Sequence, residues 1–394
     1  MQPSRRIRSI VQGASDGWGV HYRARALEAA GRPVTFLTVG DHDVLASAGI
    51  VERMIASARS GALGYAASPG TPALRAAVAA RVAAVTGAPA GPENVVVTTG
   101  GQAALFAAMQ AALDPGDACV LIDPWYATFP MTVRAAAGRV VSVPARPERG
   151  FAPDPAEIDA VAAASGARAL LVNSPNNPTG AVYPRAVMEG VAAVCRARDL
   201  WLISDEVYDA LSFDAPHLSP RSLPGMAERT LVVGSLSKSH AMTGFRIGWV
   251  AGPAETCALV ADHAIAATYG APGFIQAAAL HALTAEPEAE ATIAARYRRR
   301  RDAALAVFEG GDVVGAHRPA GAMYLMLDVR AACPSGEDFA LRLLEEEGVA
   351  VMPGESFGPA AAGHVRVALT IPDEALLAAL RRLRAFAERV RAPA

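Results

Sequence analysis

The sequence predicts an α/β protein built around a mostly parallel sheet with helices on both faces. Seven short apolar runs rich in β-branched residues alternate with helical segments in the middle of the chain. The runs lack clean apolar–polar alternation, as expected for parallel strands that are buried on both faces. Composition agrees, because 52% of the 394 residues are hydrophobic, enough to fill large cores. The runs are 95–98, 119–123, 140–143, 169–173, 201–204, 230–234 and 247–251.

A second pattern begins at about residue 311. Three strand-like runs, AMYLMLDV, GVAVM and HVRVALT, are interspersed with helical segments at 337–347 and 373–391, which predicts a smaller α+β unit. Residues 253–310, between the two patterns, are expected to be helical. Near residue 71, the SPGTP turn predicts a helix that is capped by Thr71 and begins at Pro72.

Charge and composition argue against nucleic-acid and membrane partners. The formal net charge is −2, and no stretch is apolar and long enough to cross a bilayer. The one dense basic cluster, Arg296 to Arg301, follows three glutamates and is expected to be a solvated helix face. The four cysteines (Cys119, Cys195, Cys257 and Cys333) have no metal-ligand spacing. They are expected to be isolated buried thiols in a cytoplasmic protein, with no metal.

Lys238 is the only lysine in the chain, since every other basic residue among the 36 Lys and Arg is arginine. Arginine keeps its proton at any accessible pH, whereas a lysine amine can lose it and attack a carbonyl to form a Schiff base. Ser235 and Arg246 flank this lysine, and a hydroxyl with a guanidinium suits a phosphate. The alternative is a surface lysine without function. A phosphorylated aldehyde cofactor, pyridoxal phosphate, explains all three residues.

This stretch resembles the class I/II aminotransferases of pyridoxal-phosphate fold type I. Their motif S-x-S-K-x-x-x-x-x-G-x-R is matched with every spacing kept by Ser235, Ser237, Lys238, Gly244 and Arg246. The resemblance implies a transaminase, acting on an amino acid and a 2-oxo acid, in which Lys238 binds the cofactor and then acts as the general base. It also implies a homodimer, and a division into a large domain over 46–285 and a small domain formed by 1–45 and 286–394.

Further candidate site residues follow the predicted strands, where ligands of open α/β sheets bind. Two glycines open a helix after 95–98, and free N–H groups at a helix start form an anion site. By resemblance, Gly100, Gly101 and Gln102 hold the cofactor phosphate. Tyr126 stacks on the cofactor ring, with Trp125 as the alternative. Either aromatic residue could instead belong to the core.

The next two strands end on polar motifs. After 169–173 comes SPNNPTG, in which the resemblance gives Asn177 a bond to the cofactor 3-oxygen and a place at the substrate. After 201–204 come Asp205, which pairs with the pyridinium nitrogen in the family, and Tyr208, which also reaches the 3-oxygen. A carboxylate that keeps the ring protonated makes the cofactor an electron sink. Turn, cap and core roles are the alternatives for these residues.

Three more site residues rest on family position. Gly40 ends a strand expected over 35–40 and lies near the substrate carboxylate. Arg366 binds that carboxylate, its alternative being an exposed strand position, and Tyr65 reaches the phosphate of the neighbouring subunit, its alternative being a core or interface tyrosine. The loop after Gly40 reads GDHDV where the family has G-[DE]-P-D-F, so Asp41 and Asp43 match. His42 departs, and is either a substrate contact or a solvated side chain.

Several strings outside the shared site, including YGAPGFIQ and FGPAAAGHVRV, look more like the arginine:pyruvate branch of the family than its aspartate branch. A guanidinium donor needs a carboxylate in the pocket, for which Asp16, Asp41 and Asp43 are candidates. That carboxylate should be near solvent or mobile, because pyruvate offers it no partner. An aspartate or aromatic aminotransferase and a β-lyase on the same fold are the alternatives. A regulator is disfavoured, since residues 1–30 are too short for a DNA-binding unit.

Overall fold

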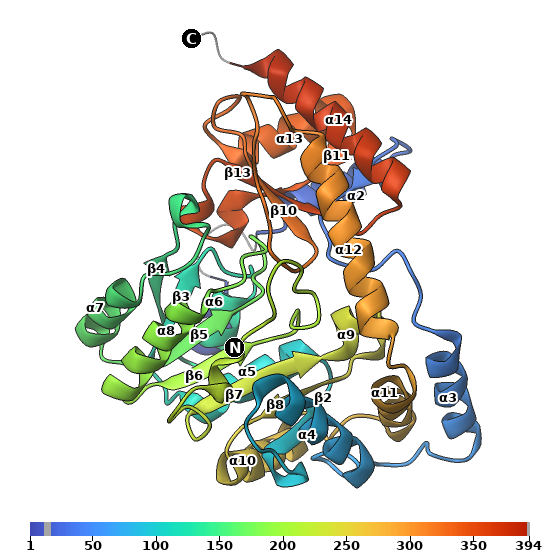
Figure 1. Cartoon of the computed structure of the whole chain (residues 1–394), viewed down its shortest axis with the longest axis vertical. Helices are drawn as coiled ribbons and strands as arrows, with labels where there is room; N and C mark the ends of the chain where they lie inside the picture. The colour runs from blue at the N-terminus through green and yellow to red at the C-terminus, as the bar shows by residue number, and fades with distance from the viewer. Residues whose placement is uncertain (12–16, 392–394) are drawn as a thin grey trace.

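The computed structural model describes residues 1–11 and 17–391. At its centre lies a seven-stranded sheet of order β2-β8-β7-β6-β5-β3-β4 (Figure 1). β8 is antiparallel to β2 and β7, and the remaining neighbours pair in parallel. All seven predicted strands are confirmed: β2 (Val95–Thr98), β3 (Ala118–Asp123), β4 (Arg139–Pro144), β5 (Ala167–Asn173), β6 (Trp201–Asp205), β7 (Thr230–Ser235) and β8 (Gly248–Ala251).

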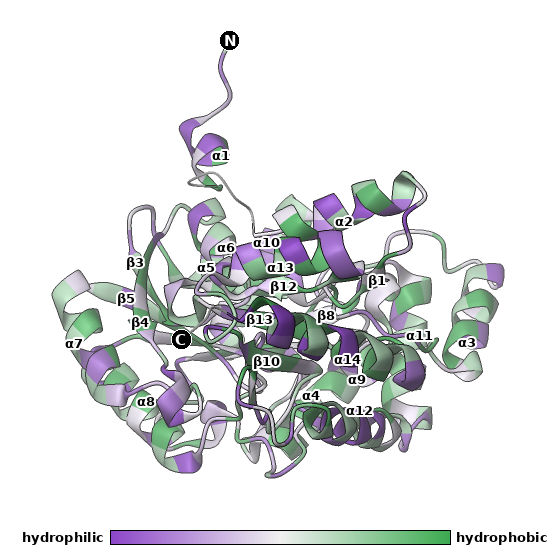
Figure 2. Ribbon diagram, turned by 90° about the horizontal axis from the view of Figure 1, so that it is seen from above, coloured by the Kyte–Doolittle hydropathy of each residue, from purple (hydrophilic) through white to green (hydrophobic). Residues whose placement is uncertain are grey.

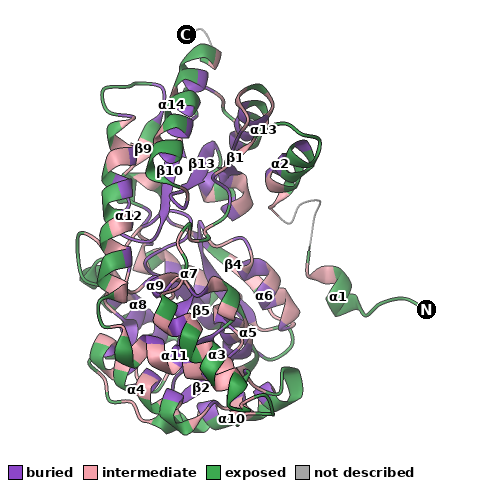
Figure 3. Cartoon of the chain, turned by 90° about the vertical axis from the view of Figure 1, so that its right-hand side faces the viewer, coloured by how far each residue is buried: buried purple, intermediate pink, exposed green. Residues whose placement is uncertain are grey.

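Helices cover both faces of this sheet, so the central strands are buried (Figure 3). One face packs on α5 (Gly101–Ala112), α6 (Phe129–Ala135) and α10 (Ala254–Ala267). The other packs on α7 (Pro155–Ser165) and α8 (Arg185–Ala197), and the antiparallel end of the sheet on α4 (Pro72–Thr86), with α3 (Ala48–Arg59) and α11 (Gly273–Ala285) beyond it. The strands β2, β3, β7 and β8 are therefore buried along their whole length, as the sequence indicated, whereas the edge strand β4 is partly exposed.

Local signals set the ends of these helices. The Asp154 side chain accepts a hydrogen bond from Ala156 N and starts α7, and Gly166 ends that helix at positive φ. Helix α4 begins at Pro72 and has Thr71 at its N-cap position, both as predicted. The Thr71 side chain makes no capping bond; its backbone N–H donates instead to Oε1 of Gln276, 2.7 Å away.

A smaller unit packs above the large sheet. Its four-stranded antiparallel sheet has the order β12-β13-β10-β9, from β9 (Gly315–His317), β10 (Tyr324–Asp328), β12 (Met352–Pro353) and β13 (His364–Ala368). The helices α12 (Ala289–Ala306), α13 (Gly336–Glu347) and α14 (Asp373–Val390) surround it. Strands expected from AMYLMLDV, GVAVM and HVRVALT are thus present, and so are both predicted helices.

The N-terminal segment joins this smaller unit. Helix α2 (Gly19–Ala29) packs on α13, and β1 (Thr35–Phe36) pairs in parallel with β11 (Val349–Ala350). β1 is shorter than the predicted strand, because after Leu37 the backbone leaves β11 and accepts a bond from Ala368 N. Helix α1 (Arg5–Ser9) stands out from the body and contacts α6 (Figure 2). The domain limits at 45 and 285 stay a prediction.

The solvated arginine cluster expected on α12 is partly wrong. Arg300 is 4% exposed and Arg301 0% exposed, and both guanidinium groups are paired with carboxylates. Arg300 binds both oxygens of Asp43, at 2.9 and 2.6 Å, and also Asp373. Arg301 donates to Asp214 over 2.8 Å. Both arginines are therefore structural, because buried charge is stable only when it is paired.

The cysteines are unpaired thiols, of which Cys119, Cys195 and Cys257 are buried and Cys333 is half-buried. None of the described helices combines the length and the apolar character that a membrane span requires.

Candidate active site

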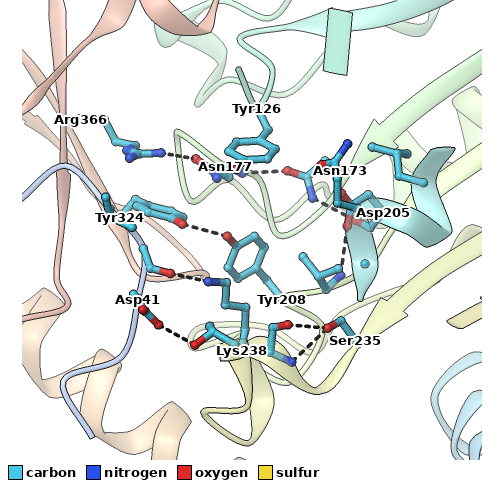
Figure 4. Close-up of a pocket in the computed structure, with 18 of the residues that line it drawn as sticks. Asp41, Tyr126, Asn173, Asn177, Asp205, Tyr208, Ser235, Lys238, Tyr324 and Arg366 are labelled. Atoms are coloured by element: carbon cyan, nitrogen blue, oxygen red, sulfur yellow. Dashed lines mark hydrogen bonds between the residues drawn. The ribbon is translucent and has the colours of Figure 1, made fainter. Parts of the chain in front are cut away.

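A cavity of about 310 Å³ opens at the carboxyl ends of the parallel strands, facing the small sheet. Most of the residues predicted from the sequence line it, although they come from segments more than 300 residues apart (Figure 4). The predicted residues on its wall are Gly40, Gly101, Gln102, Tyr126, Asn177, Asp205, Tyr208, Ser235, Ser237, Lys238, Arg246 and Arg366.

Lys238 lies on α9 (Leu236–Ser239), a single turn that begins at the end of β7 with Ser235 as its cap. Its Nζ donates a hydrogen bond to the carbonyl oxygen of Gly40. Burial lowers the pKa of the Lys238 amine to about 8, and the cations Arg366 and Arg246 add to that effect. A larger share of this amine than of an exposed lysine is therefore uncharged near neutral pH, in the form that attacks a carbonyl or accepts a proton.

Asp205 ends β6 and is almost fully buried. Burial raises the pKa of its carboxyl to about 7, although the Val207 N–H donates to Oδ1 over 3.2 Å and opposes that rise. Within the described chain no cation lies within ion-pair distance of this carboxylate. A protonated ring nitrogen placed beside Asp205 would supply that cation and restore the ionised form.

Tyr208 lies one turn after Asp205, and its Oη is 2.9 Å from Oη of Tyr324 on β10. Both rings are buried, and burial raises the pKa of the Tyr208 hydroxyl well above its usual value. The hydroxyl therefore remains protonated and able to donate a hydrogen bond into the cavity. Asn177 faces the same space, and its Oδ1 is already occupied by a bond from Arg366. Its Nδ2 is left to donate.

Arg366 sits on β13, 1% exposed, with its guanidinium between the rings of Tyr324 and Phe357 at 4.4 and 4.6 Å. Nη1 donates to Asn177 over 2.9 Å and Nη2 donates to the carbonyl of Thr38. Its buried Nε has no hydrogen-bond partner. In the described residues no carboxylate lies within ion-pair distance of this guanidinium. A ligand carboxylate would supply both the hydrogen-bond acceptor that Nε lacks and the negative charge that the guanidinium lacks.

An anion cradle forms where α5 begins. Gly100 adopts φ +92°, and a Cβ on it would come within 2.5 Å of Nη2 of Arg246. A Cβ at this position would therefore displace the Arg246 guanidinium from beside the start of the helix, where the first backbone N–H groups have no intrahelical partner. The Ser235 hydroxyl lies 2.8 Å from Oγ of Ser237 and 2.9 Å from the Ile247 carbonyl. Hydroxyls, backbone N–H groups and a guanidinium together suit a phosphate.

Some predicted residues lie elsewhere. Tyr65 is 89% exposed and does not line the cavity; its ring packs against Tyr269 with centroids 4.7 Å apart. Trp125 lines a second cavity, which leaves Tyr126 as the aromatic residue at the site. Gly100 does not line the cavity but lies against the Arg246 guanidinium of the cradle. His42 bonds to Tyr297 Oη over 3.0 Å instead of facing the cavity.

The three candidate carboxylates differ in their position and in their partners. Asp43 does not line the cavity, and its charge is already paired with that of Arg300. Asp16 lies outside the described residues. Asp41 is exposed and lines the cavity, where its Oδ1 accepts a hydrogen bond from Oγ1 of Thr243 over 2.7 Å.

Sequence reasoning missed Tyr324, Asn173 and Trp18, all of which line the cavity. Asn173 Nδ2 donates to the Asp205 carbonyl over 3.0 Å, and its Oδ1 accepts from Asn177 N over 2.8 Å. A polar residue ending the apolar run 169–173 was an available signal. Tyr324 gave none, because an aromatic residue in a strand looks like core, and Trp18, which lies just before α2, belongs to no motif.

Comparison with known proteins agrees with this arrangement. The family described as aminotransferase class I and II matches residues 32–383. The arginine–pyruvate transaminase AruH of Pseudomonas aeruginosa is 46% identical over 94% of this chain and 95% of its own length. The aspartate/prephenate aminotransferase of Thermus thermophilus is 40% identical over 96% of this chain and 97% of its own length.

Solved structures agree as well. The aspartate aminotransferase of Thermus thermophilus with maleate superposes with a TM-score of 0.91 at 37% identity, covering 98% of this chain and 100% of that one. The chain therefore belongs to the class I and II aminotransferases, enzymes that use pyridoxal phosphate. The residues fit that cofactor: the cradle suits its phosphate, and the buried, unpaired Asp205 suits its ring nitrogen.

Proposed function

We propose that this transaminase moves the amino group of a basic L-amino acid, arginine first, to pyruvate. The observation that carries the donor is Asp41, an exposed carboxylate on the cavity wall that is not engaged by an arginine. A guanidinium side chain entering the cavity would pair with it. The similarity to an arginine–pyruvate transaminase supports the same choice.

The position of Asp41 also suits the acceptor. Pyruvate brings only a methyl group, so a carboxylate awaiting a guanidinium must stay hydrated during that half of the cycle. Asp41 is exposed and Thr243 already bonds one of its oxygens, so it needs no ligand to be stable. A dicarboxylate donor would meet the negative charge of Asp41. The cations on the described wall of the cavity are Lys238, Arg246 and Arg366, and each has a role in binding the cofactor or the α-carboxylate.

The chemistry divides among the wall residues. When bound, pyridoxal phosphate supplies an aldehyde that exchanges amino groups and a ring that withdraws electrons from Cα. Lys238 would hold that aldehyde through its Nζ, and the same amine would move the proton at the substrate Cα as general base and acid. Asp205 keeps the ring nitrogen protonated. Tyr208 and Asn177 would donate hydrogen bonds to the ring 3-oxygen, and Tyr126 would pack against the ring.

Substrate and phosphate are held by separate groups. The Arg366 guanidinium, whose Nε lacks a partner, binds the α-carboxylate near Gly40, where a Cβ would overlap Tyr324 Oη at 2.0 Å. Gly100, Gly101, Gln102, Ser235, Ser237 and Arg246 form the phosphate cradle. The residues that bind the substrate α-carboxylate and the cofactor phosphate are therefore distinct from those that carry out the chemistry. This division leaves room for different substrate side chains on the same α-amino acid centre.

The active form is proposed to be a homodimer in which Tyr65 of each subunit completes the phosphate site of the other. Tyr65 is 89% exposed and Tyr269 55% exposed, and Leu63 and Ile265, on neighbouring segments, are exposed as well. Such apolar exposure is unfavourable unless a partner covers it. Sedimentation velocity tests the oligomeric state. Tyr65→Phe should weaken cofactor binding and leave the oligomeric state unchanged.

A donor and acceptor panel tests the proposal. Purified enzyme is offered arginine, alanine, aspartate or tyrosine, each with pyruvate or 2-oxoglutarate, and alanine or glutamate formation is followed. Arginine with pyruvate should give the highest kcat/KM. If aspartate with 2-oxoglutarate exceeds it by more than about tenfold, roughly 1.4 kcal/mol of transition-state preference, the donor assignment is wrong. Ammonia release without amino-group transfer would instead indicate a β-lyase.

A further inference from the structure

Two histidines and an aspartate lie side by side on the small sheet, although they are distant in sequence. Asp328 on β10 pairs in register with His364 on β13, and His317 on β9 pairs with Met326, two residues before Asp328. Residues two apart on a strand point to the same face, so all three side chains share one face. In the described residues, no other group of three His, Cys, Asp or Glu side chains brings its ligand atoms this close, within 4.8 Å of one another.

The spacing of the two imidazoles matches a metal site. Nε2 of His317 and Nε2 of His364 are 3.3 Å apart. Two nitrogens bound to one tetrahedral Zn²⁺ at about 2.0–2.1 Å are separated by about 3.3–3.4 Å. Without a cation the same contact is an N–H···N hydrogen bond in which one ring donates and the other accepts. If the His317 proton moves from Nε2 to Nδ1, the Nε2 atoms of His317 and His364 both present a lone pair toward the same point.

The surroundings already hold two of the ligands in place. The Nδ1 of His364 lies 3.1 Å from the Ala362 carbonyl, and a proton donated there leaves Nε2 as the lone pair. Arg330 donates to both oxygens of Asp328, at 2.9 and 2.5 Å. Oδ1 of Asp328 also accepts from the Arg330 backbone N–H over 3.0 Å. Oδ2 accepts a single bond among the described residues, from Arg330, and therefore keeps a lone pair for a cation.

A hydrophobic cover completes the arrangement. The ring of Phe151, from the segment between β4 and α7, meets both imidazoles edge-on with centroids at 5.0 and 6.0 Å. His364 is 1% exposed, whereas His317 and Asp328 are half-buried, so the cluster keeps one side open to solvent. A fourth ligand, a water molecule, can enter from that side.

We propose that His317, Asp328 and His364 form a binding site for a late first-row divalent cation, with Zn²⁺ as the best match. Two imidazole nitrogens and one carboxylate oxygen suit Zn²⁺, Co²⁺ or Ni²⁺, and do not suit Mg²⁺ or Ca²⁺. The site is separate from the transamination chemistry. A bound cation joins β9, β10 and β13, and so stabilises the sheet that carries Arg366, two residues after His364.

Direct titration tests this site. Tag-free, cofactor-loaded enzyme is titrated with Co²⁺, whose ligand-field absorption lies at longer wavelength than the cofactor, and Zn²⁺ affinity is measured against a chromophoric chelator. The variants are His317→Gln, Asp328→Asn and His364→Gln. The control is His263→Gln, which removes a histidine of α10 that contacts Phe106 outside the cluster.

Wild type and His263→Gln should bind one equivalent per chain, and the melting temperature should rise with the cation. Each ligand variant should bind more weakly by at least about 10–100-fold. The half-buried positions His317 and Asp328 keep the test valid if His364→Gln fails to fold. Equal affinity in wild type and ligand variants, or no saturable binding to wild type, would overturn the proposal.

Discussion

Nη1 of Arg366 donates a hydrogen bond to Oδ1 of Asn177 across 2.9 Å. This bond connects β13 of the small sheet to the loop that follows β5 of the large one, two segments that are far apart in the chain. It also fixes the Asn177 amide so that Nδ2 is the atom turned to donate. The group proposed to bind the substrate and a group proposed to bind the cofactor therefore orient each other.

Replacing Arg366 should impair every amino donor alike. Arg366→Lys keeps a positive charge but loses the planar fork, and kcat/KM for arginine and for alanine should fall by about 10–100-fold, the equivalent of one charged hydrogen bond. Steady-state kinetics with both donors measures this. A loss confined to one donor would mean that Arg366 contacts the side chain and not the α-carboxylate.

Lys238→Arg should keep the charge and the fold but abolish the absorbance of lysine-bound cofactor and all multiple turnover. A guanidinium cannot bind the aldehyde covalently, and no second lysine exists in the chain to replace it. Absorbance spectra with added cofactor and a turnover assay report the two losses. Sustained turnover by this variant would contradict the assignment of the whole site.

Asp205 should make the stability of the cofactor-free protein depend on pH. Its pKa is raised from 3.8 to about 7, so its contribution to the free energy of unfolding is full below 3.8 and is lost as the pH rises through about 7. The free energy of urea unfolding of wild type, relative to that of Asp205→Asn, should therefore fall across that range by on the order of 2–4 kcal/mol. The exposed Asp114→Asn is the control. A constant difference would show that Asp205 is ionised throughout.

Asp41→Asn should distinguish donors. With arginine, kcat/KM should fall by about 10–100-fold, because a charged hydrogen bond is lost, whereas alanine should be used as before. Each donor is paired with a fixed concentration of pyruvate in an initial-rate assay. An equal effect on both donors would place Asp41 in the handling of Lys238, whose amine it also influences electrostatically.

The buried arginines of α12 should contribute more to the free energy of unfolding than the exposed arginines beside them. Arg300→Met leaves Asp43 unpaired and should reduce the free energy of unfolding by about 3 kcal/mol. Arg298→Met, at an exposed position of the same helix, should change it by no more than about 0.5 kcal/mol. Urea unfolding followed by circular dichroism compares the two. Similar losses would mean that the Arg300 pairs are neutral to stability.

Much of the fold was predictable because strands buried on both faces leave continuous apolar runs, and all seven in the large sheet were found in this way. Site residues were predictable where they follow such strands, as Asp205 and Asn177 do. Arg300 was misjudged because its partners Asp43 and Asp373 come from distant segments, and local charge density does not report pairing in space.

Tertiary clusters were beyond reach for the same reason. Tyr324 meets Tyr208 only when the small sheet packs over the large one. His317, Asp328 and His364 come from three strands, so no local spacing of metal ligands marks them in the sequence. These residues are brought together by register and not by proximity along the chain.

The solitary lysine also makes the enzyme unusually simple to label. Lys238 offers the one side-chain primary amine in the sequence, and it is half-buried in the cavity. An amine-directed reagent of small size can therefore modify a single side chain, and bound cofactor should protect that side chain. The extent of labelling would report the fraction of subunits that carry cofactor, without any measurement of turnover.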